Sequence, residues 1–451
     1  APALLRIALS IPLHLSFNYN EGWNAYHATE VMRGAGLYPA APRFFFNNYP
    51  PLSFFVLATA SRLFGDPIVA GRWISLAAFI AWVALVQPIG RALGCRANET
   101  RFAALLFGAN TLLFTEYVGI NDPELLGHAV AAFGLLAVLQ RPRTIGRMWA
   151  CAVMFSVAVF IKHSLLVVPV VCVTWLMMFD RRAGRALLVA GATVGVAGIV
   201  CCVSMFGWGF LAQLAAPRMY VLARAVGKSS LWMVRMIALI AILIVLIRRF
   251  PRDGSVALCA LYAGIASFVG AISIGGDGVN WNVMFDATWA LCLSAAVALN
   301  RLTGAPVVSR RIRARLAATY LIVPTIALAV NARTAWLSPS YWLTPRRVES
   351  AAAGRDIAFI KSHAGPALCE ELALCFWAGK PVEVDLYNMQ QRIRTASRRS
   401  DELVQLLNAR YFSVVQLDTP TRPLDRPFAD ALLRSYRVDH EGVDGRLLIP
   451  Q

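Results

Sequence analysis

Acidic side chains gather in a few polar segments of an otherwise apolar chain. Glu21 follows the first apolar run, beside Asn20, and Asp122 and Glu124 stand just before the fourth. A carboxylate held at the end of an apolar segment can serve as general base toward an acceptor hydroxyl. The alternatives are an interfacial carboxylate for Glu21 and a helix-start role for the other two, since acids stabilise helix N-termini. His128 lies four residues after Glu124, on the same helix face.

Aromatic residues follow Glu21 closely, at Trp23, Tyr26 and His27. Rings of this kind stack on sugar faces and also anchor chains at a membrane interface. They favour Glu21 over Asp122 as the base, because Asp122 has the stronger helix-capping alternative.

Cationic and glycine-rich turns supply the remaining candidates. Lys162 and His163 lie at a turn between two short apolar runs, where a cation can hold a lipid phosphate or snorkel to the interface. The GGDG segment at 275–278 is not a phosphate-binding P-loop, since no Gly-Lys-Ser/Thr follows it. It is either a flexible turn or a site segment that contributes Asp277 or Asn280.

Membrane-spanning helices must position these residues. The chain has 451 residues, of which 58% are hydrophobic and 15% charged, against about 25% charged in ordinary soluble domains; the mean hydropathy is +0.58. We therefore predict an all-α polytopic membrane bundle with about eleven spans. The apolar runs fall at 1–17, 67–90, 102–118, 125–140, 148–161, 165–179, 186–206, 231–247, 255–273, 284–299 and 316–331.

The net charge of +18 is distributed as in a membrane protein, which excludes nucleic acid as the partner that it first suggests. Seventeen basic residues lie in the short loops after even-numbered runs, against seven in the odd-numbered loops before the tail. The positive-inside rule then makes the even loops cytoplasmic and the odd loops outward-facing. Every candidate site residue named above falls on the outward side.

The apolar segment 51–64 tests this count. Fourteen helical residues reach only about 21 Å, too short to cross the membrane. We interpret it as a helix at the outer interface, within an outer loop at 18–66.

Residues 332–451 change to an ordinary polar composition and predict a small extracytoplasmic α/β domain after a membrane module at 1–331. We expect a helix around 356–363, short strands in PALCEEL and ALCFWAG, and a helix that Ser400 caps. A strand in ARYFSVVQLD, a helix at 428–436 and a hairpin turning at 442–445 follow.

Cysteine usage gives two further expectations. Cys369 and Cys375 either form a disulfide or are two small buried residues in adjacent strands. The sequence has no zinc-binding motif and demands no metal, although a divalent ion as cofactor stays open.

Short motifs in the outward loops resemble the GT-C superfamily of membrane glycosyltransferases. They are the Asn20–Glu21 pair after the first span and YPPLSF at 49–54 on the interfacial segment. The second acid of the family resembles Asp122, and the late polar loop resembles 275–280. The branch that looks most similar contains aminoarabinose transferases and protein O-mannosyltransferases, and the resemblance covers about residues 1–300.

Two departures from the family pattern bear on mechanism. The usual Asp-Glu of the first loop is Asn20–Glu21, so an amide stands where the base is expected. The resemblance then implies Glu21 or Asp122 as the base, or a chain that has lost transfer activity. The lysine often found before Pro-Pro is Tyr49, so the cationic turn after the fifth run would have to neutralise the phosphate.

The resemblance implies an inverting transfer of a sugar from a polyprenyl-phosphate-linked donor to a lipid, glycan or protein acceptor. The expected location is a cell membrane, namely a bacterial inner membrane, with the tail domain outside. The alternatives are a transporter or flippase of lipid-linked sugars and a catalytically inactive GT-C-like binding protein. Few charges lie inside the spans, which disfavours a transporter.

Overall fold

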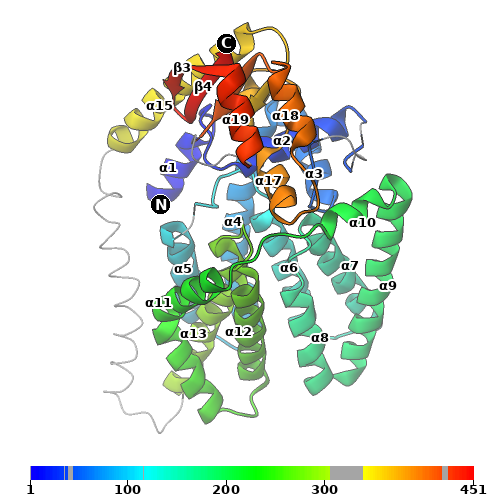
Figure 1. The fold of residues 1–451 in the computed structure, drawn as a ribbon. Helices are drawn as coiled ribbons and strands as arrows, with labels where there is room; N and C mark the ends of the chain where they lie inside the picture. The colour runs from blue at the N-terminus through cyan, green and yellow to red at the C-terminus, as the bar shows by residue number, and fades with distance from the viewer. Residues whose placement is uncertain (1, 35, 39–43, 115, 305–338, 419–424) are drawn as a thin grey trace.

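The chain folds into a helical bundle that carries a smaller α/β unit at one end (Figure 1). The computed structural model describes residues 2–34, 36–38, 44–114, 116–304, 339–418 and 425–451. The boundary expected between 331 and 332 lies outside these residues, as does the expected span at 316–331.

Long apolar helices form the bundle. They are α4 (Pro67–Ala92), α5 (Ala97–Phe114), α6 (Glu124–Leu139), α7 (Ile145–Ile161), α8 (Val167–Phe179), α9 (Arg181–Phe206), α11 (Leu222–Arg249), α12 (Gly254–Ser273) and α13 (Phe285–Gly304). The short α10 (Gly209–Leu214) and the 3₁₀ helix η1 (Trp281–Met284) lie in the loops between them. Aspartates 66, 180 and 253 cap α4, α9 and α12 by accepting backbone N–H groups, as N-cap residues do.

Within the described residues, five helical segments are long and apolar enough to cross a membrane: α4, α9, α11, α12 and η1 with α13. Helices α3, α6, α7 and α8 are apolar but shorter. The apolar runs thus coincide with helices from the second run to the tenth. The first run is different: α1 (Pro2–Ser10) covers only its first part, and the chain from 11 to 17 is irregular because its backbone serves a buried arginine described below.

The loops that follow the even-numbered apolar runs meet at one end of the bundle. Arg143, between α6 and α7, pairs with Asp180 before α9 at 3.5 Å. Arg301 near the end of α13 pairs with Asp253 before α12 at 2.7 Å and donates to the carbonyl of Leu93 after α4. The basic, even-numbered loops therefore share one end of the bundle, and the odd loops meet the α/β unit at the other.

The outer segment between α1 and α4 contains α2 (Asn20–Met32) and α3 (Leu52–Phe64). Helix α3 is the short helix expected at 51–64. Helix α2 is polar in sequence, yet eight consecutive residues from Glu21 to Ala28 are buried. Helix α2 is therefore buried because other elements of the fold cover it, and not because it has an apolar stripe.

The α/β unit is a four-stranded sheet in the order β1-β2-β4-β3. Strand β1 pairs in parallel with β2, and β4 pairs antiparallel with both β2 and β3. The strands are β1 (Ala367–Cys369), β2 (Val414–Leu417), β3 (Tyr436–Gly442) and β4 (Gly445–Pro450), and the helices are α15 (Pro339–Ser362), α16 (Leu372–Trp377), α17 (Leu386–Arg394), α18 (Asp401–Asn408) and α19 (Arg426–Ser435).

Most elements expected in this unit are present, including the hairpin at 442–445. The segment ALCFWAG is an exception: it forms α16 rather than a strand, because only three residues of β1 pair with β2 before the chain turns away. Ser400 stands at the start of α18, but its hydroxyl bonds Asp425 at 2.5 Å instead of capping the helix.

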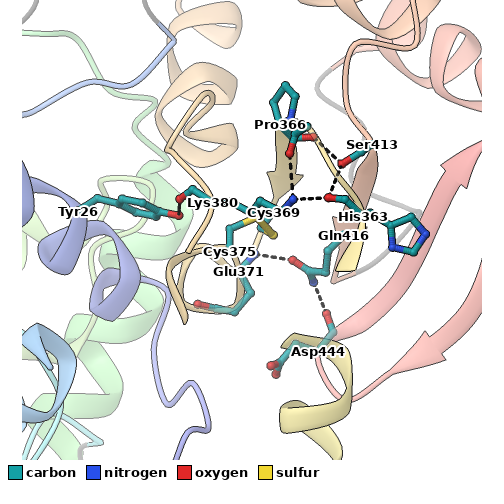
Figure 2. Close-up of a disulfide and its surroundings, with 11 residues drawn as sticks. Tyr26, His363, Pro366, Cys369, Glu371, Cys375, Lys380, Ser413, Gln416 and Asp444 are labelled. Carbon is teal, nitrogen blue, oxygen red and sulfur yellow. Dashed lines mark hydrogen bonds between the residues drawn. A yellow bond between two sulfur atoms is a disulfide. The ribbon is translucent and has the colours of Figure 1, made fainter. Parts of the chain in front are cut away.

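A disulfide joins Cys369 and Cys375 and ties the end of β1 to α16 (Figure 2). This confirms the first of the two expectations for these residues. Helix α16 packs on α2 so closely that a Cβ on Gly22 would lie 2.2 Å from the backbone nitrogen of Ala373. The Tyr26 hydroxyl also donates to the Lys380 carbonyl at 2.8 Å.

Candidate active site

Glu21 forms a fully buried ion pair with Arg72 of α4, and both side chains are 0% exposed. The guanidinium donates to both carboxylate oxygens, at 2.7 and 2.6 Å. The backbone N–H groups of Phe17 and Asn121 also donate to this carboxylate, at 2.9 and 3.0 Å. A carboxylate has about four lone-pair sites, so this Glu21–Arg72 pair is saturated.

Arg72 is satisfied as completely as its partner. Its remaining N–H groups donate to the carbonyls of Ile11, Leu13 and Leu15 at 2.5 to 3.0 Å. These contacts hold the irregular segment after α1 against α4. We had favoured Glu21 as the base from its aromatic neighbours, but this geometry is that of a structural ion pair.

A second group of buried charges, which we call the Lys162 cluster, contains Asn20, Asp122, Glu124 and Lys162. The Lys162 ammonium lies 3.2 Å from Asp122 Oδ1 and contacts Glu124 Oε2. The backbone N–H of Glu124 donates to Asp122 Oδ1 at 2.9 Å. The Asn20 amide donates to the other oxygen of Asp122, Oδ2, at 3.0 Å. Four residues predicted from sequence for the site thus meet in one cluster.

Lys162 is charged in this setting. Its side chain, at the C-terminal end of α7, is buried, which by itself would lower the pKa of the ammonium. Asp122 and Glu124 outweigh burial and raise the Lys162 pKa well above its usual value. The ammonium also lies 4.9 Å from the centre of the Tyr49 ring, within the range of a cation–π contact.

The cluster continues into the bundle through Glu124. Asn282 of η1 donates to Glu124 Oε2 at 2.8 Å, and His128 Nε2 lies 3.1 Å from Glu124 Oε1. On the other side of the ring, His128 Nδ1 lies 3.3 Å from Asp286 Oδ1. The Tyr262 hydroxyl of α12 donates to the same Asp286 oxygen at 2.6 Å.

The Tyr49 ring borders the Lys162 cluster. His163 is exposed and its ring lies 6.4 Å from that of Tyr49. Burial raises the pKa of Tyr49, and the nearby cations Lys162 and Arg218 partly offset it. Burial likewise raises the pKa of Tyr387 on α17 to about 12, again offset in part by Arg218. Arg218 thus lies near both tyrosines; it is exposed and forms no ion pair within the described part of the chain.

The three aromatic residues after Glu21 pack inside the protein. Trp23 donates to the carbonyl of Phe46 at 3.1 Å, and the His27 ring stacks on Phe45 with centroids 4.2 Å apart. Trp23, Tyr26 and His27 are 2%, 6% and 1% exposed. Their rings form part of the core under the α/β unit, and that packing accounts for them without a sugar.

Asp277 lies away from the Lys162 cluster. It pairs with Arg224 of α11 at 2.9 Å and accepts from Gln391 of α17 at 2.7 Å. It therefore ties the late outward loop to the α/β unit. Burial would raise the pKa of Asp277, but these partners lower it overall. Asn280 is exposed, at the start of η1.

A cavity of about 530 Å³ lies between this loop and the α/β unit. One wall carries Tyr19 and Tyr387, and apolar side chains such as Phe428 and Leu432 form part of the lining. The Tyr387 hydroxyl is buried and accepts or donates no hydrogen bond within the described ranges.

Sequence reasoning missed several members of the site, namely Arg72, Asn121, Asn282 and Asp286. Arg72 was visible as a lone arginine inside an apolar run, a type of residue that is usually functional or paired. Asn282 and Asp286 follow the predicted Asn280 closely in the chain, and it is they that contact Glu124 and His128. Over the described residues, no group of three or more His, Cys, Asp or Glu side chains could hold a metal ion.

The fold is similar to the solved folds of ArnT and of an archaeal oligosaccharyltransferase, which confirms the expected resemblance at the level of architecture. The chain is similar to ArnT from Cupriavidus metallidurans in the apo state, with a TM-score of 0.65 and 16% identity over 99% of this chain and 96% of that one. ArnT bound to undecaprenyl phosphate gives 0.64 and 15% over the same shares.

A more distant similarity is to the Archaeoglobus fulgidus oligosaccharyltransferase tethered with an acceptor peptide. The TM-score is 0.54 and the identity 11%, over 97% of this chain and 72% of that one. No protein-family model and no curated protein sequence matches the chain. At these identities the similarities establish the fold.

Proposed function

We propose that this chain is an integral membrane glycosyltransferase that moves a sugar from a polyprenyl-phosphate-linked donor to an acceptor hydroxyl with inversion. The observation that carries the proposal is the Lys162 cluster, in which the Asp122 carboxylate lies beside a buried cation where the outward loops meet. The fold supports it: ArnT has been crystallised with undecaprenyl phosphate and the archaeal enzyme with dolichol phosphate. We further propose that residues 1–331 form the transfer module and that the cluster faces the extracytoplasmic side, with the domain from 332 onward.

Asp122 is the general base of the proposed reaction. Its Oδ2 accepts only the Asn20 amide among the described residues, so a lone pair remains for a hydroxyl proton. Asp122 takes this proton while the acceptor oxygen forms a bond to the anomeric carbon. The bond from that carbon to the phosphate oxygen breaks, and polyprenyl phosphate leaves with the electron pair.

Asn20 fits this assignment. It stands where an acid is usual in the first loop, but it donates to Asp122 instead of competing with it for the proton. The amide orients Asp122 without adding a second negative charge beside it. The departure from the family pattern is therefore compatible with activity, provided that Asp122 rather than residue 20 is the base.

Lys162 pairs with Asp122, and Arg218 neutralises the donor phosphate. The ammonium is enclosed by two carboxylates and the Tyr49 ring, whereas Arg218 is exposed and forms no ion pair among the described residues. A guanidinium suits phosphate because it donates two parallel hydrogen bonds. Tyr49 and His163 line the path between these two cations, and the cavity beside Tyr387 offers room for the acceptor.

Transfer by the reconstituted full chain tests the proposal. We would offer a panel of undecaprenyl-phosphate-linked pentoses and hexoses, with membrane lipids and glycans as acceptors, and measure release of undecaprenyl phosphate. A transferase consumes donor in an acceptor-dependent way. A flippase would move the donor across vesicles without cleaving it, and an inactive binding protein would do neither.

The matched pair of variants is Asp122→Asn and Asp401→Asn. Asp401 is an exposed acid at the start of α18, distant from the cluster in the fold. Release that Asp122→Asn abolishes and Asp401→Asn preserves supports the assignment. Equal release by both would show that Asp122 is not the base.

A further inference from the structure

His128 is buried inside the bundle with a carboxylate on each ring nitrogen. Nε2 lies within hydrogen-bond distance of Glu124, at 3.1 Å, whereas Nδ1 lies 3.3 Å from Asp286 at ion-pair distance and makes no hydrogen bond among the described residues. The three side chains come from α6 and α13 and are at most 8% exposed. Water therefore does little to satisfy either nitrogen, and the two acids decide the protonation of the ring.

A neutral imidazole cannot serve both contacts. It carries one N–H and one lone pair, so one of its nitrogens would face a carboxylate oxygen lone pair to lone pair. An imidazolium carries an N–H toward each acid: Nε2 donates to Glu124, and Nδ1 faces Asp286 at ion-pair distance. Asp286 Oδ1 also accepts from the Tyr262 hydroxyl at 2.6 Å.

The charge balance of the region gives the same answer independently. Three buried carboxylates, those of Asp122, Glu124 and Asp286, meet a single lysine, Lys162. Without a second cation two negative charges would stay uncompensated in a dry interior, which is costly. Protonated His128 reduces this excess to one negative charge. The Asn20 and Asn282 amides and the Tyr262 hydroxyl donate hydrogen bonds to the three acids and so stabilise the remaining charge.

The aromatic surroundings also suit a cation. The indole of Trp82 on α4 stacks on His128 with centroids 4.3 Å apart and planes 3° from parallel. A ring face is attractive to a positive charge. Trp289 lies behind Trp82, 6.3 Å away, so the stack is held in the core. No other titratable group among the described residues contacts the ring.

We infer that His128 is a buried imidazolium that positions Glu124, and through Glu124 the Lys162 ammonium beside Asp122. It acts at one remove from the reacting atoms and is a positioning residue. His128 holds Oε1 of Glu124, which leaves Oε2 of Glu124 in contact with Lys162. The Lys162 ammonium is therefore shared between Glu124 and Asp122. Its catalytic consequence rests on the proposed function, whereas its protonation state does not.

The protonation state is tested by ¹⁵N NMR of the full chain in nanodiscs with labelled histidine. At pH 7.5 a solvated imidazole, with an ordinary pKa of about 6.5, is mostly neutral. We expect one of the six histidines to give an imidazolium signature that His128→Gln removes and His440→Gln leaves. The inference is overturned if every buried histidine is neutral, whether or not the chain transfers sugar.

A double-mutant cycle tests the positioning role. His128→Gln alone removes the cation and leaves both acids, whereas His128→Gln with Asp286→Asn keeps the net charge of the natural cluster. We expect the single variant to lower kcat by about 10- to 100-fold and the double variant to recover most of it, a coupling that is common for residues in one charged network. The donor KM should change little in either.

A packing role predicts the opposite order, because the double variant removes more native contacts than the single one. A double variant that is less active than His128→Gln would therefore sink the positioning role. An imidazolium signal in a chain that cleaves no lipid-linked donor would leave the buried cation in place and refute the proposed function instead.

Discussion

The Glu21–Arg72 pair and the Lys162 cluster differ in how fully their carboxylates are used. They interlock through neighbouring residues: Asn20 donates to Asp122, and the Asn121 backbone donates to Glu21. Glu21 accepts four hydrogen bonds, which is about the full capacity of a carboxylate. Asp122 accepts three.

Under the proposed function, this difference separates a structural acid, Glu21, from the proposed base, Asp122. A saturated carboxylate has no lone pair for an incoming proton and no room for an acceptor hydroxyl. A general base needs one vacant lone-pair position on its carboxylate. Burial does not distinguish the two acids, but their hydrogen-bond partners do.

The sharpest way to break the comparison is to remove the proposed base. Asp122→Asn keeps the shape and the amide contacts but cannot take a proton, so we expect turnover to fall by about 10²- to 10⁴-fold. Donor-cleavage assays on purified, correctly folded protein measure this, with Asp401→Asn as the control. Full turnover by Asp122→Asn would remove the functional distinction between the two acids.

Glu21→Gln should instead lower stability. Removing one partner of a buried ion pair leaves an uncompensated charge, which costs about 3–5 kcal/mol. We expect a clear drop in the thermal unfolding midpoint in detergent, while the molecules that stay folded keep their turnover within a few-fold. A variant that is as stable as the natural chain but inactive would restore Glu21 as the base.

Arg218→Gln addresses the donor side. Loss of a charged hydrogen bond to phosphate costs about 1.5–3 kcal/mol, so the donor KM should rise by about tenfold or more with kcat nearly unchanged. Arg399→Gln, at an exposed arginine of the α/β unit, is the control. If the KM rises with Lys162→Met and not with Arg218→Gln, the phosphate ligand is Lys162.

The smallest effect concerns the α/β unit over the Glu21–Arg72 pair. Burial raises the pKa of Glu371 from 4.5 to about 8, with Asp444 and Glu21 adding to it. A carboxyl with a raised folded-state pKa stabilises the fold at low pH and loses that contribution as pH rises through the folded value.

We therefore expect the unfolding midpoint of the natural chain to decline from about pH 4.5 to pH 8. Glu371→Gln should flatten the decline, because its amide is neutral throughout. Part of the slope below pH 6 should persist, since burial also raises the pKa of Asp444 to about 6. Parallel curves for the two proteins would show that Glu371 does not titrate in this range.

The helices and the meeting of outward loops were predictable because apolar run length and loop charge act locally. These local signals place four polar residues at span ends on one predicted side of the membrane: Asn20, Asp122, Glu124 and Lys162. Their assembly needed only that those ends converge.

Pairings that depend on helix packing were not predictable. Nothing near Arg72 in sequence indicates Glu21 as its partner, and the contact of His128 with Asp286 joins helices that the sequence does not order in space. Likewise, the pattern of Trp23, Tyr26 and His27 describes an aromatic helix but not what covers it. The α/β unit covers it here, so rings that looked available for a sugar are core.

The covering of α2 by the α/β unit has a consequence for how the chain folds during synthesis. The ribosome makes α2 long before α16: Tyr26 bonds a residue 354 positions later, and Gly22 meets α16 at a similar distance along the chain. The aromatic side of α2 therefore stays uncovered on the nascent chain until α16 has been made. A chain that stops before α16 leaves these rings exposed, so the burial of α2 is one of the late steps of folding.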